Sequence, residues 1–330
     1  MSVPPEVSIA RRLVALRNLS PPIDILALAG EYAAVEQLEF PAELDLDGVC
    51  LNVKISGRRK IIVNIAHRAA TRIRFTLAHE LGHVLIPWHT GSIVDDINVP
   101  AGDASAEYWR MESEANRFAS ELLMPAGWIG EIARSSGSPA ERTRWVSREA
   151  DVSYLAAAIR LTAFLPSGYV CAITNDHGQV VSTSRSPGTS AIAPRRSEYI
   201  TEPNQRYSWA TGFCSETRGN RTYLWWYYES RSQLAEVSGS DDWRAQLDNL
   251  VGQLSLGDAE ARKLKSSISA IIAHANGSPR EDRSAEAVYD ACLQRFDSLG
   301  RTNPYILALM RMPGFKPFVS LKVQDLAARR

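Results

Sequence analysis

The sequence has no excess of charge of either sign, because its 37 Lys and Arg residues are balanced by 37 Asp and Glu residues. This balance excludes a global electrostatic attraction to nucleic acid or to an anionic membrane. Also missing is any run of roughly 18 apolar residues, the length that spans a bilayer. The first apolar stretch is interrupted by Arg11, Arg12 and Arg17, so we expect neither a signal peptide nor a membrane anchor.

Cysteine is scarce, since a chain of 330 residues contains only four: Cys50, Cys171, Cys214 and Cys292. They are far apart in the sequence and form no Cys-x-x-Cys pair, which argues against a thiolate zinc site. Few cysteines without a secretion signal are typical of free thiols in a reducing compartment. We therefore expect a cytoplasmic protein.

The chain is long enough for two or three domains, and its 45% hydrophobic and 22% charged residues are ordinary for a globular protein. Periodicity and breaker residues predict the order helices, hairpin, helices, small sheet, helices, which is an α+β fold. Expected helices cover residues 8–20, 23–35, 68–86, 106–123, 126–135, 139–149 and 152–165, and a helical pattern resumes at about 241. Expected strands cover 49–55, 60–64, 169–174, 179–184 and 222–229, and residues 89–105 and 184–206 are expected to be loops.

The expected helix 68–86 contains the motif His79-Glu80-x-x-His83. Two histidines four residues apart lie on the same helix face, so both rings can reach one metal ion at about 2.0–2.1 Å. Glu80 beside them can take a proton from a metal-activated water, which is the zincin arrangement. A helical wheel supports this interpretation, because apolar side chains surround the helix except along one arc that holds Thr76, His79, Glu80 and His83.

A third metal ligand must come from elsewhere, and two candidates compete. His89 has the spacing of the metzincin pattern, in which a Gly turns the chain after the second His. Ile86 stands at that Gly position and suits the turn poorly, although Pro87 can still bend the chain. The alternative ligand is Glu112 on the second long helix, where Asn116 one turn further on would hold the other ring nitrogen of a ligand His.

Two further expectations concern the surroundings of this motif. Glu114 lies about 200° round its helix from Glu112, so we expect it to be solvated or to pair with Arg110 or Arg117. The strand 60–64 directly precedes the motif helix. Either a strand of the expected hairpin, formed by 49–55 and 60–64, pairs with an extended substrate segment, or both strands lie inside a closed sheet.

Two segments, FTLAHELGHVL at 75–85 and ESEANRFASELLMP at 112–125, resemble the ImmA/IrrE family of intracellular metallopeptidases. The short strand IIVN at 61–64 strengthens the resemblance, which covers about residues 10–130. It implies His79, His83 and Glu112 as metal ligands and Glu80 as the general base. The implied metal is zinc, with manganese as the alternative.

The same resemblance implies a chain of several domains. We expect a zincin-like peptidase domain of helices and a small sheet at 1–135, followed by a helix-turn-helix-like segment at 136–165. The strands expected between 166 and 235 fit a small β-rich, GAF-like domain. The helical pattern of the sequence, and not the resemblance, predicts a helical region at 236–330.

The predicted function is zinc-dependent cleavage of a helix-turn-helix transcriptional repressor, which would relieve repression in a stress response or during induction of a mobile element. The resemblance alone implies this substrate. Two other functions stay open. Residues 139–162 would engage DNA or a partner protein in one of them, with a metal site that is only structural. In the other, the aromatic strand 222–229 lines a pocket for a small molecule in the C-terminal half. No membrane partner is expected.

Overall fold

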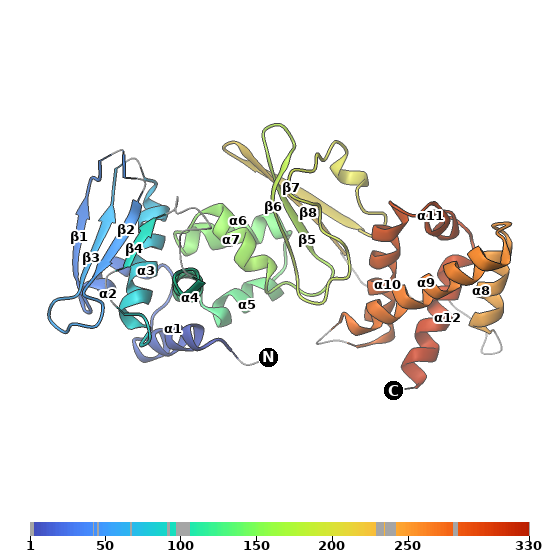
Figure 1. Cartoon of the computed structure of the whole chain (residues 1–330), viewed down its shortest axis with the longest axis horizontal. Helices are drawn as coiled ribbons and strands as arrows, with labels where there is room; N and C mark the ends of the chain where they lie inside the picture. The colour runs from blue at the N-terminus through green and yellow to red at the C-terminus, as the bar shows by residue number, and fades with distance from the viewer. Residues whose placement is uncertain are drawn as a thin grey trace. The chain divides into compact units, whose positions relative to one another are not determined.

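The computed structural model describes residues 3–41, 43–44, 46–66, 68–90, 93–96, 106–228, 234, 242–279 and 283–329. By its internal contacts the chain divides into two compact units. Met1–Gly137 and Glu141–Leu161 form the N-terminal unit, and Ser138–Ala140 and Thr162–Arg330 form the C-terminal unit. Both units contain helices and a small sheet, so the predicted α+β class is confirmed (Figure 1). The finer division into four domains stays a prediction, and its last boundary, at 235/236, lies outside the described residues.

The N-terminal unit is built on a four-stranded sheet with the order β1-β3-β2-β4, in which β1 runs parallel to β3 and the other pairs are antiparallel. The strands are β1 (Ala34–Leu38), β2 (Leu46–Leu51), β3 (Lys60–Asn64) and β4 (Ile93–Asp96). The helices are α1 (Pro5–Leu16), α2 (Ile25–Gly30), α3 (Ala70–Leu85), α4 (Ala106–Leu123), α5 (Ala126–Arg134), α6 (Pro139–Glu149) and α7 (Tyr154–Thr162).

The sheet corrects two expectations from the sequence. The expected helix 23–35 ends at Gly30, and the chain then forms strand β1, whose side chains are mostly exposed at the sheet edge. The expected loop 89–105 contains the short strand β4, which pairs with β2. The hairpin question is also decided, because β2 and β3 both lie inside the sheet and cannot accept an added strand.

Helix α3 lies between the sheet and helix α4. Residues from Thr76 to Val84 are all buried, as the surrounding arc of apolar side chains requires. Gly82 allows α4 to approach closely, because a methyl group there would lie 3.0 Å from the Phe118 ring of α4. The polar side chains in the second half of α3 are therefore held in the interior, between two layers of structure.

The C-terminal unit has an antiparallel sheet with the order β6-β5-β8-β7 and a group of five helices. Its strands are β5 (Val170–Asn175), β6 (Val180–Arg185), β7 (Gly212–Arg218) and β8 (Arg221–Tyr227), and a 3-10 turn, η1, covers Pro203–Gln205. Its helices are α8 (Trp243–Gly252), α9 (Asp258–Gly277), α10 (Ala285–Gly300), α11 (Pro304–Met310) and α12 (Phe315–Ala328). Strand β7 had no counterpart among the elements expected from the sequence.

Helix α10 joins the sheet region of this unit to its helices. The side chains of Gln294, Asp297 and Ser298 accept hydrogen bonds at 2.9 to 3.1 Å from backbone N–H groups within residues 190–208. These acceptors are all buried, and buried backbone donors need such partners. The β-rich and helical parts therefore pack as one unit.

The aromatic strand β8 is buried on both faces. Trp225 and Trp226 are fully buried, and their neighbours Tyr223 and Leu224 are nearly so. These side chains fill the core rather than an open pocket. Among the helices in the part of the chain that the structure describes, none combines the length and the apolar character needed to cross a bilayer.

Candidate metal centre

Helix α3 brings the rings of His79 and His83 together on one face. Their Nε2 atoms are 3.0 Å apart, and both side chains are almost completely buried. One helical turn separates the two residues, so the i, i+4 spacing alone produces this approach.

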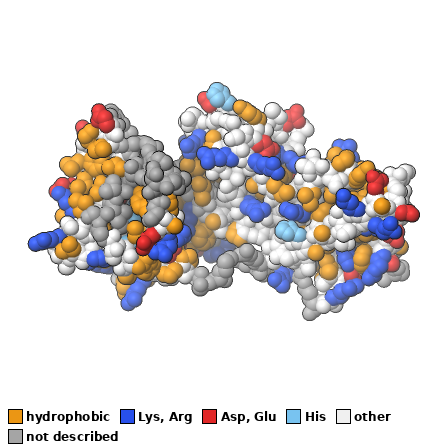
Figure 2. All heavy atoms as spheres, viewed as in Figure 1, with side chains coloured by type: hydrophobic (Ala, Val, Ile, Leu, Met, Phe, Trp, Pro, Cys, Tyr) orange, Lys and Arg blue, Asp and Glu red, His pale blue; other side chains and the backbone are white. Residues whose placement is uncertain are grey.

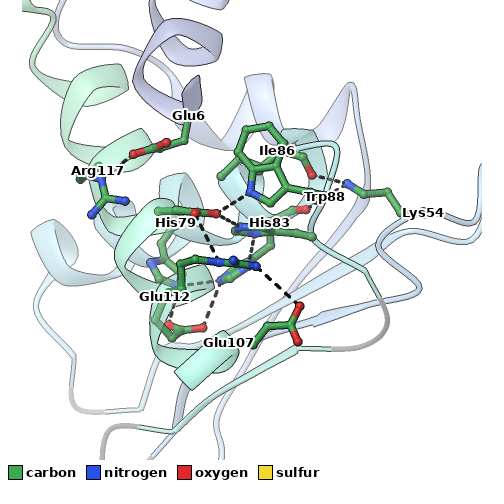
Figure 3. A network of polar contacts seen from close by, with 12 residues as sticks. Glu6, Lys54, His79, His83, Ile86, Trp88, Glu107, Glu112 and Arg117 are labelled. Carbon is green, nitrogen blue, oxygen red and sulfur yellow. Dashed lines mark hydrogen bonds and ion pairs between the residues drawn. The ribbon is translucent and has the colours of Figure 1, made fainter. Parts of the chain in front are cut away.

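Helix α4 supplies a carboxylate that closes a triangle with the two rings (Figure 3). Glu112 Oε2 lies 3.1 Å from His79 Nε2, and its Oε1 lies 3.4 Å from His83 Nε2. Ligand atoms bound tetrahedrally at about 2.1 Å from zinc would be ~3.4 Å apart. These separations therefore fit one metal ion. Within the described part of the chain, His79, His83 and Glu112 offer the donor atoms that such an ion needs.

The charge states of this group also suit a metal. Burial would raise the pKa of Glu112, but the hydrogen bonds from His79 and His83 outweigh it and lower the pKa to about 2. Burial lowers the pKa of His83 to about 4, against the opposing effect of Glu112. An ionised carboxylate and a neutral imidazole are the forms that bind metals, so these residues could hold zinc or manganese.

Glu80 lies on α3 between the two histidines and is fully buried. Its carboxylate faces Gly48 of β2 so closely that a methyl group on Gly48 would lie 2.6 Å from Glu80 Oε1. The same methyl group would lie 2.7 Å from Thr76 Cγ2. Glycine at this position therefore gives the Glu80 side chain its space.

Asn116 contacts the His79 ring at the nitrogen that does not face Glu112. Its Oδ1 lies 3.1 Å from His79 Nδ1. If His79 offers the Nε2 lone pair to a metal, its proton is on Nδ1 and is donated to Asn116. The structure thus places Asn116, one turn along α4 from Glu112, where this role needs it.

His89, the alternative metal ligand considered from the sequence, lies outside the triangle. Its Nδ1 lies 2.9 Å from Nδ1 of His83, on the side of that ring away from Glu112. Its Nε2 lies 3.0 Å from Glu114 Oε2. Both ring nitrogens of His89 are thus used in hydrogen bonds and neither faces the triangle.

Glu114 is buried, so of the two expectations for it, solvation or pairing with an arginine, the first does not hold. Burial would raise its pKa, but hydrogen bonds from Trp88 and His89 outweigh this effect and lower it. The expected pairing with Arg110 is present, with Nε 3.7 Å from Glu114 Oε1. Arg117, the other expected partner, pairs with Glu6 of α1 instead.

Sequence reasoning missed Gly48 and the contact between His89 and Glu114. A glycine beside an apolar strand pattern is a signal of close backbone approach, and Gly48 directly precedes the segment expected as a strand. The second contact carries no such signal, because its residues are 25 positions apart and meet only through the chain after α3.

Comparison with family models gives one match. Residues 43–162 match the model of the IrrE N-terminal-like domain, a family of M78 peptidases. The matched segment runs from before β2 to the end of α7 and includes every residue of the triangle. Comparison with curated proteins gave no match. The resemblance to the ImmA/IrrE family is thereby confirmed, and the His79–His83–Glu112 triangle lies in an IrrE N-terminal-like domain of metallopeptidase type.

Proposed function

We propose that this chain is a zinc-dependent endopeptidase in which His79, His83 and Glu112 hold the metal and Glu80 is the general base. One observation carries the proposal: three donor atoms from α3 and α4 lie 3.0 to 3.4 Å apart in the interior, on the helix that also bears Glu80. The peptidase family of the domain supports the same reaction.

A zinc ion held there would polarise the scissile carbonyl and lower the pKa of a water molecule. The chain's own residues perform the remaining steps. Glu80 takes a proton from the attacking water and delivers it to the leaving amine. Its burial keeps bulk water from competing for that proton, and the absence of a side chain at Gly48 lets the carboxylate occupy its position beside β2.

For the substrate, we propose a helix-turn-helix transcriptional repressor, cleaved in the cytoplasm during a stress response or induction of a mobile element. The support is the resemblance to the ImmA/IrrE family. The metal could be manganese instead of zinc, since two imidazoles and a carboxylate suit either ion.

The proposed reaction is tested by metal content and peptide hydrolysis measured on the same preparations. We expect the purified chain to bind one zinc ion and to hydrolyse its substrate. Glu80→Gln should keep the metal and lose about 10²–10⁴-fold in rate, the usual contribution of a general base. Glu107→Gln is the matched control, because Glu107 is an exposed glutamate on α4. Equal rates for Glu80→Gln and wild type would contradict the proposal.

The substrate is tested with the same variant as a trap. Tagged Glu80→Gln protein should retain an uncut helix-turn-helix repressor when it is purified from its host, and wild type with zinc should cut that repressor in vitro. Enrichment of unrelated proteins, or a repressor that wild type leaves intact, would contradict this part of the proposal alone.

DNA binding is less well supported as the main role. On the face shown in Figure 2, Lys and Arg side chains form separate groups among neutral and acidic ones rather than a continuous basic surface. Phosphate recognition relies on clustered cations. A gel-shift assay with the Glu80→Gln protein would separate the two roles, since DNA binding would survive the loss of hydrolysis.

A further inference from the structure

Four side chains form a connected polar chain behind the second histidine of the motif, on the side away from Glu112. His83 Nδ1 lies 2.9 Å from His89 Nδ1, and His89 Nε2 lies 3.0 Å from Glu114 Oε2. The indole N–H of Trp88 donates to the same carboxylate oxygen at 2.5 Å. His83 and His89 are completely buried, so their ring nitrogens are shielded from bulk solvent.

We propose that His89 and Glu114 are positioning residues that fix the tautomer and the ring orientation of His83 for metal binding. This inference rests on the proposed metal site. The Oε2 atom of Glu114 accepts the indole N–H of Trp88, so it is an acceptor toward His89 as well, and His89 must carry its proton on Nε2. The Nδ1 atom of His89 is then an acceptor, and His83 must donate to it from its own Nδ1. The Nε2 lone pair of His83 is thereby left for the metal.

The arrangement behind the other histidine supports this assignment. His79 contacts Asn116 through Nδ1, so both rings of the triangle have an acceptor on the side away from the metal. A metal-binding imidazole gains orientation and basicity from such a partner. Helix α4 supplies hydrogen-bond partners behind both rings. It bears Asn116 for His79 and Glu114 for the His83–His89 pair, in addition to the proposed ligand Glu112.

If His89 served only to fill space, the zinc affinity of its variants would depend on side-chain volume and not on the hydrogen bond to His83. His89→Phe keeps the ring volume and removes the acceptor. His89→Asn places an amide oxygen near the position of Nδ1 and keeps the contact with His83. His89→Gln places its amide near the position of Nε2, so it keeps the contact with Glu114 and loses the one with His83.

The experiment is a zinc competition assay on the full chain with these three variants. We expect zinc affinity to fall about 10- to 100-fold in His89→Phe and His89→Gln, the usual cost of losing the partner of a metal-binding imidazole. His89→Asn should recover most of the affinity. His177→Phe is the matched control, because His177 is an exposed histidine in the turn between β5 and β6, and its affinity should stay near that of wild type.

A second measurement does not depend on the variants folding. Nitrogen-15 NMR of the histidine rings reports the tautomer of each of the six histidines in the wild-type chain. We expect a proton on Nδ1 of His83 and on Nε2 of His89 in the zinc-loaded protein. The opposite tautomer at His89, or full zinc affinity in His89→Phe, would overturn the inference while leaving the proposed peptidase intact. A wild type that binds no zinc would overturn the proposed function and this inference with it.

Discussion

Gly48 shows how much one hydrogen atom in place of a side chain can matter in this domain. A methyl group at this position would lie 2.6 Å from Glu80 Oε1, so Gly48→Ala must displace the proposed general base. A displacement of about 1 Å can cost roughly 10²-fold in rate. We expect that loss of hydrolysis with unchanged zinc content, measured by a peptide cleavage assay and by elemental analysis.

Gly127→Ala is the control for this substitution. Nothing lies within 4 Å of a methyl group at Gly127 in α5, so hydrolysis should stay near the wild-type rate. Wild-type activity in Gly48→Ala would show that Glu80 does not need its present position.

At the residue scale, the sequence predicts contacts that depend on helix periodicity and misses those that depend on the chain between helices. The i, i+4 spacing of His79 and His83 is enough to place both side chains on one face of a helix. The same periodicity relates Glu112 to Asn116 on α4. The pairing of His89 with Glu114 was not predictable, because the path of the chain after Pro87 decides it.

At the element scale, the C-terminal end of α3 is held by a lysine from outside the helix. Lys54 Nζ donates to the carbonyl oxygens of Val84 at 3.0 Å and Ile86 at 2.7 Å, and lies 3.4 Å from that of His83. The last carbonyls of a helix have no partners within the helix, and a cation there also complements the helix dipole. We expect Lys54→Met to lower the free energy of unfolding by about 1–2 kcal/mol, measured by urea denaturation.

Lys60→Met tests whether this effect is specific to the helix end. Lys60 pairs with Glu36 at 2.7 Å in a solvent-exposed ion pair. Such pairs contribute about 0–1 kcal/mol, so this variant should be less destabilised than Lys54→Met. Equal destabilisation of the two variants would contradict the capping role.

The proposed metal links two elements, since it would be held by His79 and His83 of α3 and by Glu112 of α4. A ligand at 1,000 times its dissociation constant stabilises the folded state by about 4 kcal/mol. We expect a chelator to lower the melting temperature of the zinc-loaded protein by roughly 10 °C, followed by circular dichroism. Glu112→Gln should reduce the difference between the melting temperatures measured with zinc and with chelator. A wild-type melting temperature that changes with neither zinc nor chelator would contradict the proposed site.

The helices were largely predictable and the edge strands were not. The bounds expected for α4 and α6 agree with the structure, because both helices have amphipathic patterns and clear breakers at their ends. Strands β1 and β4 are short, and polar residues such as Glu36 and Asp95 interrupt their apolar pattern. Edge strands are often short and polar, which removes the alternation that identifies a strand.

At the scale of the whole molecule, the two units differ in what their sequences reveal. The N-terminal unit contains the motif His79-Glu80-x-x-His83, whose spacing predicts a metal site. The family match lies almost entirely within this unit. The C-terminal unit is joined by buried polar contacts between α10 and residues 190–208, which pair positions about 90 to 106 residues apart. Such long-range contacts leave no periodic signal, so its packing as one unit could not be predicted.

The four cysteines test the fold of both units in one measurement. Cys50, Cys171 and Cys292 are completely buried, whereas Cys214 on β7 is partly accessible. Burial raises the pKa of Cys292 to about 12 and raises that of Cys171 further. Burial, with the charge of Glu80, also raises the pKa of Cys50.

The thiolate is the reactive form, so these three groups should react slowly with a thiol reagent at pH 8. We expect one thiol to react rapidly in the native chain and all four to react after denaturation. Cys214→Ser should remove the rapid reaction, and Cys292→Ser is the control that keeps it. Rapid reaction of two or more thiols in the native chain would contradict the burial of these cysteines. Loss of one rapid reaction in Cys50→Ser would then place the discrepancy in the N-terminal unit.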